Sequence, residues 1–284
     1  MQGGRISRGW ALAKQSFAVL RADRSLLLFP VIAMPAALAA AAIVMGPGVA
    51  LYAADRQEAF LIAFGALTLY ALTFVTVFFN TALAAAAARS LDGADTTVGE
   101  GLAAARSRLG VIAAWALVQT VVGIAISAIQ EAAGDSIVGR ILAGLVNFAW
   151  SAATFFVVPV IALEGVGPRD AFKRSVSLLR ERWGEGVVGT ASVSGVVFLI
   201  ALLPIAALGV PGVMLLSGGG TDVVGGILLG LAAVVLVLAM LVGGTANAIF
   251  RVALYRYATD GVAAAGFDPT QLESAFAPKR RRRI

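Results

Sequence analysis

The sequence predicts an all-α, polytopic membrane protein in which six transmembrane helices form three hairpins, each preceded by an amphipathic interfacial helix. Composition is the first supporting observation: 60% of the residues are apolar, 13% are charged, and the mean hydropathy is +0.90. Soluble domains carry roughly 25% charged residues, so this chain has too little polar surface for a water-soluble domain of its size. The second observation is six long segments without Asp, Glu, Lys or Arg, and the third is an amphipathic pattern ahead of the first, third and fifth of them.

Each charge-free segment matches one membrane crossing, because a spanning helix needs about 20 mostly apolar residues and a helical hairpin about 40. The first segment is expected to leave the membrane near Gly46, which begins a Gly-Pro-Gly sequence. The fifth is expected to cross at 186–208, since Pro204, Pro211 and a later run of glycines favour an irregular outer segment. The six segments are 26–54, 59–88, 109–130, 141–163, 186–221 and 223–250.

Basic residues predict the orientation, because cytoplasmic segments of membrane proteins are enriched in Lys and Arg. With both termini inside, all but two of the 22 Lys and Arg residues fall in cytoplasmic segments, the exceptions being Arg56 and Arg140. We therefore expect a multi-pass protein of the bacterial cytoplasmic (inner) membrane with N- and C-termini in the cytoplasm. A cleaved signal peptide is the alternative, but the apolar run from Leu26 is longer than the roughly 7–15 residues of such a peptide.

Three segments ahead of the odd-numbered spans share a helical apolar spacing of three and four residues, which predicts one apolar face on each. They run from Ile6 to Leu20, from Val98 to Leu109 and from Phe172 to Trp183. Such helices are expected to lie in the inner membrane interface, with packing on protein as the alternative. The pattern divides a single membrane domain, residues 1–261, into pseudo-repeats 5–93, 96–165 and 168–261.

An acid and a glycine follow each even-numbered span, and glycine suits the residue after a helix, where φ is positive. An acid there opposes the helix dipole, so a basic partner is expected. Arg21, Arg106 and Arg180, which precede the odd-numbered spans, are one set of partners, and neighbouring Lys or Arg residues are another. Solvated loop acids are the alternative. The three pairs are Asp92-Gly93, Glu164-Gly165 and Asp260-Gly261.

The C-terminal residues 262–284 are expected to form a cytoplasmic basic tail. Asp268 and Pro269 match the N-cap and first position of a short helix. The basic cluster that follows is of the kind attracted to anionic lipid headgroups, and a solvated tail is the alternative. Nucleic acid is not expected as a partner, because the topology explains the basic residues and no aromatic-rich soluble domain is present. The cluster consists of Lys279, Arg280, Arg281, Arg282 and Arg283.

The sequence offers little catalytic equipment. It contains no Cys and no His, which removes thiolate chemistry, the usual zinc ligands and the Ser-His-Asp arrangement. No catalytic residue, cofactor or metal site is expected; only convergence of Asp92, Glu164 and Asp260 would suit Mg²⁺ or Ca²⁺. The spans contain no ionisable residue, which disfavours a carboxylate-dependent ion transporter. Asn80 and Asn247 are expected to bridge helices by hydrogen bonds.

Five motifs carry a family resemblance: Gly4–Trp10, Ser25–Pro30, Pro159 with Leu163–Gly165, Ala171–Ser175 and Ala253–Ala258. They resemble an uncharacterised bacterial family of six-span membrane proteins. The layout is also similar, more distantly, to the membrane domain of some glycerophosphodiester phosphodiesterases. The resemblance covers nearly the whole chain and implies fold and membrane location, without an activity to carry over.

Two functions follow as hypotheses. The first is a non-enzymatic scaffold, accessory or envelope-organising subunit that contacts anionic lipid and a membrane-protein partner. The alternative is a permease or lipid-handling transporter with a path between the hairpins. A closed core packed with alanine and glycine would favour the first, and a wide cavity open to one face would favour the second.

Overall fold

The computed structural model describes residues 5–134, 136–183, 193–217, 222–261 and 267. All regular secondary structure in these residues is helical and none of it is a strand, which confirms the all-α prediction. The helices are α1 Arg5–Ala22, the short 3-10 helix η1 Arg24–Leu27, α2 Leu28–Asp55, α3 Glu58–Leu91, α4 Val98–Arg106, α5 Leu109–Ala133, α6 Ile137–Ala153, α7 Val157–Glu164, α8 Pro168–Trp183, α9 Val193–Ser217 and α10 Asp222–Asp260.

Six helical stretches within the described residues are long and apolar enough to cross a membrane, as the sequence predicts. They correspond in order to the six charge-free segments. Five extend past the charge-free boundaries because a helix continues into polar residues once its backbone hydrogen bonds are satisfied. The stretches are Arg24–Asp55, Glu58–Leu91, Leu109–Ala133, Ile137–Glu164, Ile200–Ser217 and Val223–Asp260.

α2 continues through Pro47 to Asp55, so the predicted exit from the membrane near Gly46 is not accompanied by a helix end and stays a prediction. One predicted helix end is wrong. α9 does not become irregular after residue 208 but continues through Pro204 and Pro211 to Ser217, while residues 186–192 of the predicted span lie outside the described ones. Membrane helices tolerate proline because neighbouring helices and local adjustments satisfy the freed backbone groups.

The fourth span is divided, which the sequence does not indicate. α6 ends at Ala153, residues 154–156 form a turn, and α7 resumes at Val157. Non-helical backbone at membrane depth is tolerated where protein covers it. Here α8 supplies the cover, since its Ser175 is completely buried against the turn.

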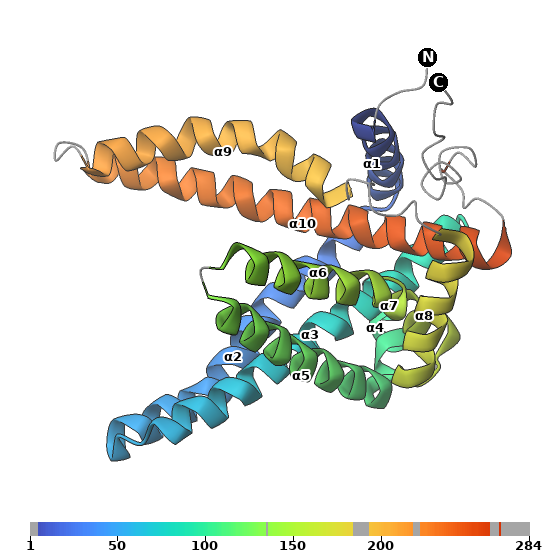
Figure 1. Ribbon diagram of the computed structural model, residues 1–284. Helices are drawn as coiled ribbons and strands as arrows, with labels where there is room; N and C mark the ends of the chain where they lie inside the picture. The colour runs from blue at the N-terminus through green and yellow to red at the C-terminus, as the bar shows by residue number, and fades with distance from the viewer. Residues whose placement is uncertain (1–4, 135, 184–192, 218–221, 262–266, 268–284) are drawn as a thin grey trace.

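The three pairs of spanning helices meet at one end of the molecule and diverge at the other (Figure 1). α2 packs along α3 and α9 packs along α10, while α5 and α6 lie between these two pairs. The meeting end carries α4 and α8, and we call it the α4–α8 end; α8 lies across the ends of the spanning helices there (Figure 1).

The core lies at the α4–α8 end, where α3 contacts α4, α5, α7 and α10. Alanines on α3 allow this close approach, because small residues bring helix backbones together. The core also contains Phe29, Trp115, Phe156 and Ile249, each almost completely buried. The buried alanines of α3 are Ala82, Ala84, Ala86, Ala87 and Ala88.

Helices are present at all three predicted amphipathic segments, as α1, α4 and α8. In α8, Ala171 and Leu178 are buried whereas Lys173 and Arg180 are exposed. Phe172 stacks on Trp150 of α6 with ring centroids 5.7 Å apart, so this part of its apolar face contacts protein. In α1 the side chains of Ser16, Val19 and Leu20 are buried, while Lys14 and Arg21 are exposed.

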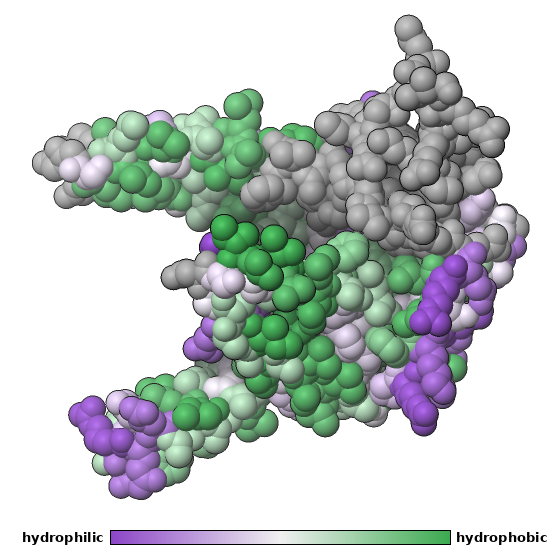
Figure 2. Space-filling view, viewed as in Figure 1, coloured by the Kyte–Doolittle hydropathy of each residue, from purple (hydrophilic) through white to green (hydrophobic). Residues whose placement is uncertain are grey.

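Hydrophilic residues gather at two boundaries of the surface shown in Figure 2. One is the turn that joins α2 to α3, and the other follows α8 at the opposite end. Apolar residues cover the middle of α5 and α6 between them, as expected of a surface that faces lipid.

Candidate functional site

The predicted acids lie at the α4–α8 end: Asp92 directly follows α3, and Glu164 and Asp260 are the last residues of α7 and α10. The glycines after them, Gly93, Gly165 and Gly261, have φ angles of 77°, 71° and 73°, which confirms the predicted left-handed positions. The described residues contain no cluster of three or more metal-ligating side chains, so Asp92, Glu164 and Asp260 do not converge there.

Asp92 pairs with Arg256 of α10, which joins the end of α3 to α10. Arg256 donates to both carboxylate oxygens, with Nη2 2.7 Å from Oδ2. These hydrogen bonds, with the positive charge of Arg256, hold the pKa of Asp92 below its ordinary value of 3.8. The Asp92 carboxylate is 58% exposed, so the pair is a superficial one that links two spanning helices.

Glu164 at the end of α7 pairs with Arg174 of α8, with Nε 3.2 Å from Oε1. The same oxygen accepts a hydrogen bond from the Tyr255 hydroxyl of α10. Arg108 donates to the carbonyl of Ile161, near the C-terminus of α7, where a cation also complements the helix dipole. These contacts fix the short α7 between α5, α8 and α10.

The other predicted ionic residues are not brought together in the same way. Among the described residues, no ion pair involves Arg21, Arg106, Arg180 or Asp260. An additional pair joins Arg89 of α3 to Glu100 of α4 at 3.1 Å. The basic cluster Lys279–Arg283 and the predicted short helix at Asp268 lie outside the described residues.

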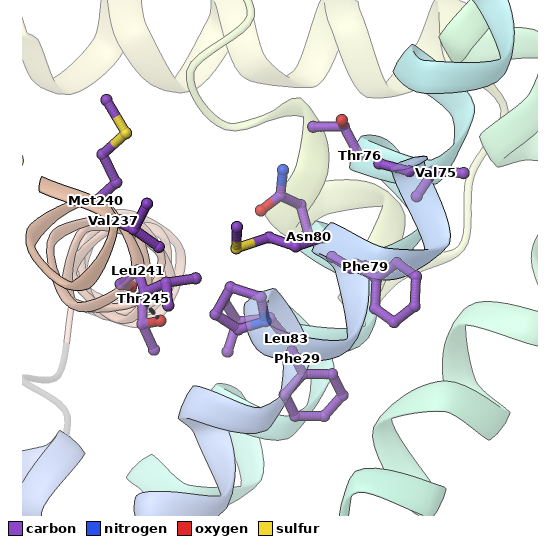
Figure 3. A pocket seen from close by; sticks show the side chains of 15 residues that line it. Phe29, Val75, Thr76, Phe79, Asn80, Leu83, Val237, Met240, Leu241 and Thr245 are labelled. Atoms are coloured by element: carbon purple, nitrogen blue, oxygen red, sulfur yellow. Dashed lines mark hydrogen bonds between the residues drawn. The ribbon is translucent and has the colours of Figure 1, made fainter. Parts of the chain in front are cut away.

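A partly open cavity of about 370 Å³ separates the α2–α3 pair from α10 (Figure 3). We call it the lateral groove. Its walls are residues 29–37 of α2, 75–83 of α3 and 237–245 of α10, and most of the side chains are apolar. Asn80 points its amide into the space between α3 and α10 (Figure 3). Thr245 satisfies its own hydroxyl by donating to the Leu241 carbonyl at 2.8 Å.

A second cavity of about 170 Å³ adjoins the lateral groove, and Asn80 and Gly244 line both. We call it the Arg251 cavity. Val158 and Pro159 of α7 form one wall, Ala84 of α3 and Ala248 of α10 form others, and Arg251 of α10 lines the cavity as its charged residue.

Arg251 is a cation held within the protein. Its guanidinium carbon lies 4.8 Å from the ring centroid of Phe155, at the break between α6 and α7. The Nε atom is buried and has no hydrogen-bond partner. No ion pair of Arg251 is found in the described part of the chain. Arg251 as a whole is partly exposed, but a cation that is partly withdrawn from water without an anion is costly, so this arrangement suits a negatively charged group entering the cavity.

The charge pattern along the chain predicts a cytoplasmic segment at Arg251, and it does not predict that Arg251 lies inside a continuing helix. α10 continues nine residues past Arg251 to Asp260. The signal was the apolar pattern after Arg251, where Val252, Ala253, Leu254 and Ala258 are buried. Because of this pattern the helix continues into the core, and Arg251 lies within it.

Six apolar spans around a small packed core, with a groove between them, define a multi-pass helical membrane protein. The chain belongs to a family of unknown function (DUF6159), which matches residues 59–267. This membership confirms the resemblance to an uncharacterised family. No curated protein and no solved structure matches the chain.

Proposed function

We propose that this chain is a non-enzymatic, lipid-handling protein of the bacterial cytoplasmic membrane that binds a membrane lipid in the lateral groove. The observation that carries the proposal is the open, largely apolar cavity of about 370 Å³ between α2, α3 and α10. Cavities of about 300–1,000 Å³ with a few polar groups are typical of small-molecule sites. An apolar groove between membrane helices is accessible to acyl chains.

The closed α4–α8 end favours a lipid over a water-soluble solute. The alanines of α3 pack there against α7 and α10, so a continuous aqueous passage through the described core has no support. A lipid enters sideways from the bilayer and needs no such passage. Of the two paths that the sequence left open, a permease channel and a lipid groove, the packing supports the groove.

The proposed orientation places the α4–α8 end at the cytoplasmic surface, with both termini in the cytoplasm. The distribution of Lys and Arg along the sequence supports it. The three hairpins then cross the membrane, and α1, α4 and α8 lie at its inner surface as amphipathic helices. The transverse position of α8 and its exposed Lys173 and Arg180 fit this placement.

A scaffold or accessory role is the second candidate. The closed, alanine-packed core favours it, as do the wide apolar faces on α5 and α6, because a partner membrane helix can replace lipid against them (Figure 2). Leu117, Ile141 and Leu145 are more than half exposed on these faces. Cross-linking in native membranes tests this role: a specific protein attached through α5 or α6 would favour it.

Filling the groove tests the lipid proposal. A Cβ added at Gly244 meets no atom within 4 Å, so Gly244→Leu extends into the space shared by both cavities without a backbone clash. Gly230→Leu on the same helix is the matched control, because Gly230 is equally open and lines neither cavity. After purification in mild detergent, mass spectrometry should find lipid on the wild type and Gly230→Leu and much less on Gly244→Leu. Equal lipid on all three proteins would reject the groove as a binding site.

A further inference from the structure

We propose that Arg251 and Asn80 form the headgroup subsite of the lateral groove and bind the phosphate of an anionic phospholipid, whose acyl chain lies along α2, α3 and α10. The inference rests on the proposed lipid-binding function and adds the chemical class of the lipid. Its basis is that the two cavities share Asn80 and Gly244 and therefore form one amphipathic site, apolar along the groove and cationic at Arg251.

Charge at the subsite selects a negative ligand. The Nε of Arg251 is buried without a hydrogen-bond partner, and the nearby Phe155 ring faces the guanidinium without neutralising it. The other residues that line the cavity, apart from the amide of Asn80, are apolar or glycine. A guanidinium presents several donors in a planar fork that matches phosphate oxygens, so a phosphate diester supplies both the charge and the acceptors that the cavity lacks.

The position of Arg251 along α10 matches the depth of a lipid headgroup. Arg251 directly follows the charge-free stretch that ends at Phe250. The groove begins at Val237, fourteen residues before Arg251, and at 1.5 Å per residue this separation is about 21 Å. One leaflet contributes about 15 Å of hydrocarbon and a few ångströms of headgroup. An acyl chain in the groove therefore reaches Arg251 with its phosphate.

Asn80 completes the subsite from the opposite helix. It lines both cavities and points its amide toward α10 (Figure 3). An amide can donate to a phosphate oxygen, whereas the hydroxyls of Thr76 and Thr245 already donate to carbonyls of their own helices, so Asn80 acts as the second contact to the headgroup. The sequence predicts a helix-bridging role for Asn80, and the open space beside it favours a ligand instead.

Selective lipid binding by the full-length protein tests the proposal. Delipidated protein in mild detergent is titrated with phosphatidylglycerol and with phosphatidylcholine, and binding is followed by native mass spectrometry. Both lipids carry a phosphate diester, but the choline of phosphatidylcholine brings a second cation close to Arg251, so we expect a preference of roughly tenfold for phosphatidylglycerol. Arg251→Gln should remove this preference, and Arg251→Lys should retain part of it because the charge remains without the planar fork.

Arg169→Gln is the matched control, since Arg169 is an exposed residue of α8 that lines neither cavity, and the same single charge is lost. Asn80→Leu is a second variant, for use if Arg251→Gln fails to fold, because Asn80 lies at an exposed position. Asn80→Leu should also weaken phosphatidylglycerol binding. Equal preference in wild type, Arg251→Gln and Asn80→Leu would overturn the inference. So would an equal loss in Arg169→Gln.

These outcomes distinguish the headgroup assignment at Arg251 from the proposed binding of lipid in the lateral groove. If Gly244→Leu removes lipid while Arg251→Gln leaves the preference intact, the groove binds lipid and the headgroup assignment is wrong. If Gly244→Leu and the wild type carry equal lipid, the proposed function itself fails.

Discussion

The hydroxyl of Ser175 donates a hydrogen bond across 2.6 Å to the carbonyl of Ala153, the last residue of α6. The same oxygen accepts a hydrogen bond from the Phe156 amide at 3.1 Å, one residue before α7 begins. One side chain from α8 thus bonds a carbonyl and an amide beside the interruption, so protein covers the non-helical backbone there. The break places Phe155 against Arg251 and so shapes the proposed headgroup subsite.

Ser175→Ala is expected to destabilise the protein, because it removes a buried hydrogen bond to the Phe156 amide and a partly buried one to the Ala153 carbonyl. The cost should be about 1–3 kcal/mol, seen as a lower midpoint of thermal unfolding in detergent. Ser177→Ala on the same helix is the control, since Ser177 donates only to the exposed Glu181. Equal midpoints for Ser175→Ala and Ser177→Ala would show that the break does not depend on this hydroxyl.

Gly101→Ala is expected to weaken packing between α4 and the core. A Cβ at Gly101 would lie 2.5 Å from the Phe29 ring and 2.9 Å from the Ala82 carbonyl oxygen. Both Phe29 and Ala82 are completely buried, so neither can move freely. Overpacking of this kind costs about 1–3 kcal/mol. Gly99→Ala in the same helix meets only ordinary contact and should be neutral or slightly stabilising; the thermal midpoints of the two variants give the comparison.

The Asp92–Arg256 pair predicts a defined pH dependence of stability. The folded pKa of Asp92 lies below its ordinary value, so the pair stabilises the fold above that value. Its contribution is lost as the pH falls through the folded pKa, which places the loss below about pH 4. Asp92→Asn should lower stability at pH 7 by less than about 1 kcal/mol, because the carboxylate is largely exposed, and should reduce the loss in acid. The measurement is the stability against unfolding from pH 7 to 3, with Asp95→Asn as the control. The same dependence of stability on pH in both variants would contradict the prediction.

The proposed orientation predicts a pattern of cysteine labelling. The chain contains no Cys, so single cysteines report without background. Gln57→Cys, in the turn between α2 and α3, should react with a membrane-impermeant reagent in intact cells. Gly167→Cys, whose added Cβ meets no atom within 4 Å, should react only after the membrane is opened. The reverse pattern would invert the topology.

The basic tail predicts salt-dependent attraction to anionic lipid. Replacing residues 279–283 with glutamine should weaken binding of the detergent-solubilised protein to phosphatidylglycerol vesicles at low salt. Each basic residue near such a surface contributes about 1 kcal/mol, and the effect should fade as salt rises. Equal vesicle binding by the wild type and the glutamine variant at low salt would show that the tail does not contribute to lipid attraction.

Local patterns were sufficient for the count and type of the main elements. The six spans follow from runs of apolar residues. Gly93, Gly165 and Gly261 mark helix ends because a positive φ after a helix depends on the local sequence alone. Proline was a poor guide to helix ends: Pro47 and Pro204 remain inside α2 and α9, where packing compensates for the missing amide.

The ionic contacts were predictable only in kind. An acid after a span does find a basic partner at Asp92 and Glu164, but the partners are Arg256 and Arg174. Which cation meets which acid depends on how α3, α7, α8 and α10 cross. No spacing along the chain encodes that crossing.

The order of residues along the chain was enough to establish that the protein is helical and has six segments apolar enough to cross a membrane. These properties are sums over neighbouring residues, because transfer to lipid and helix capping are local free energies. The break between α6 and α7, the groove between α2, α3 and α10, and the position of Arg251 beside it became visible only in the folded molecule. These features depend on side chains far apart in the sequence occupying the same volume, and packing of that kind exists only once the helices have come together.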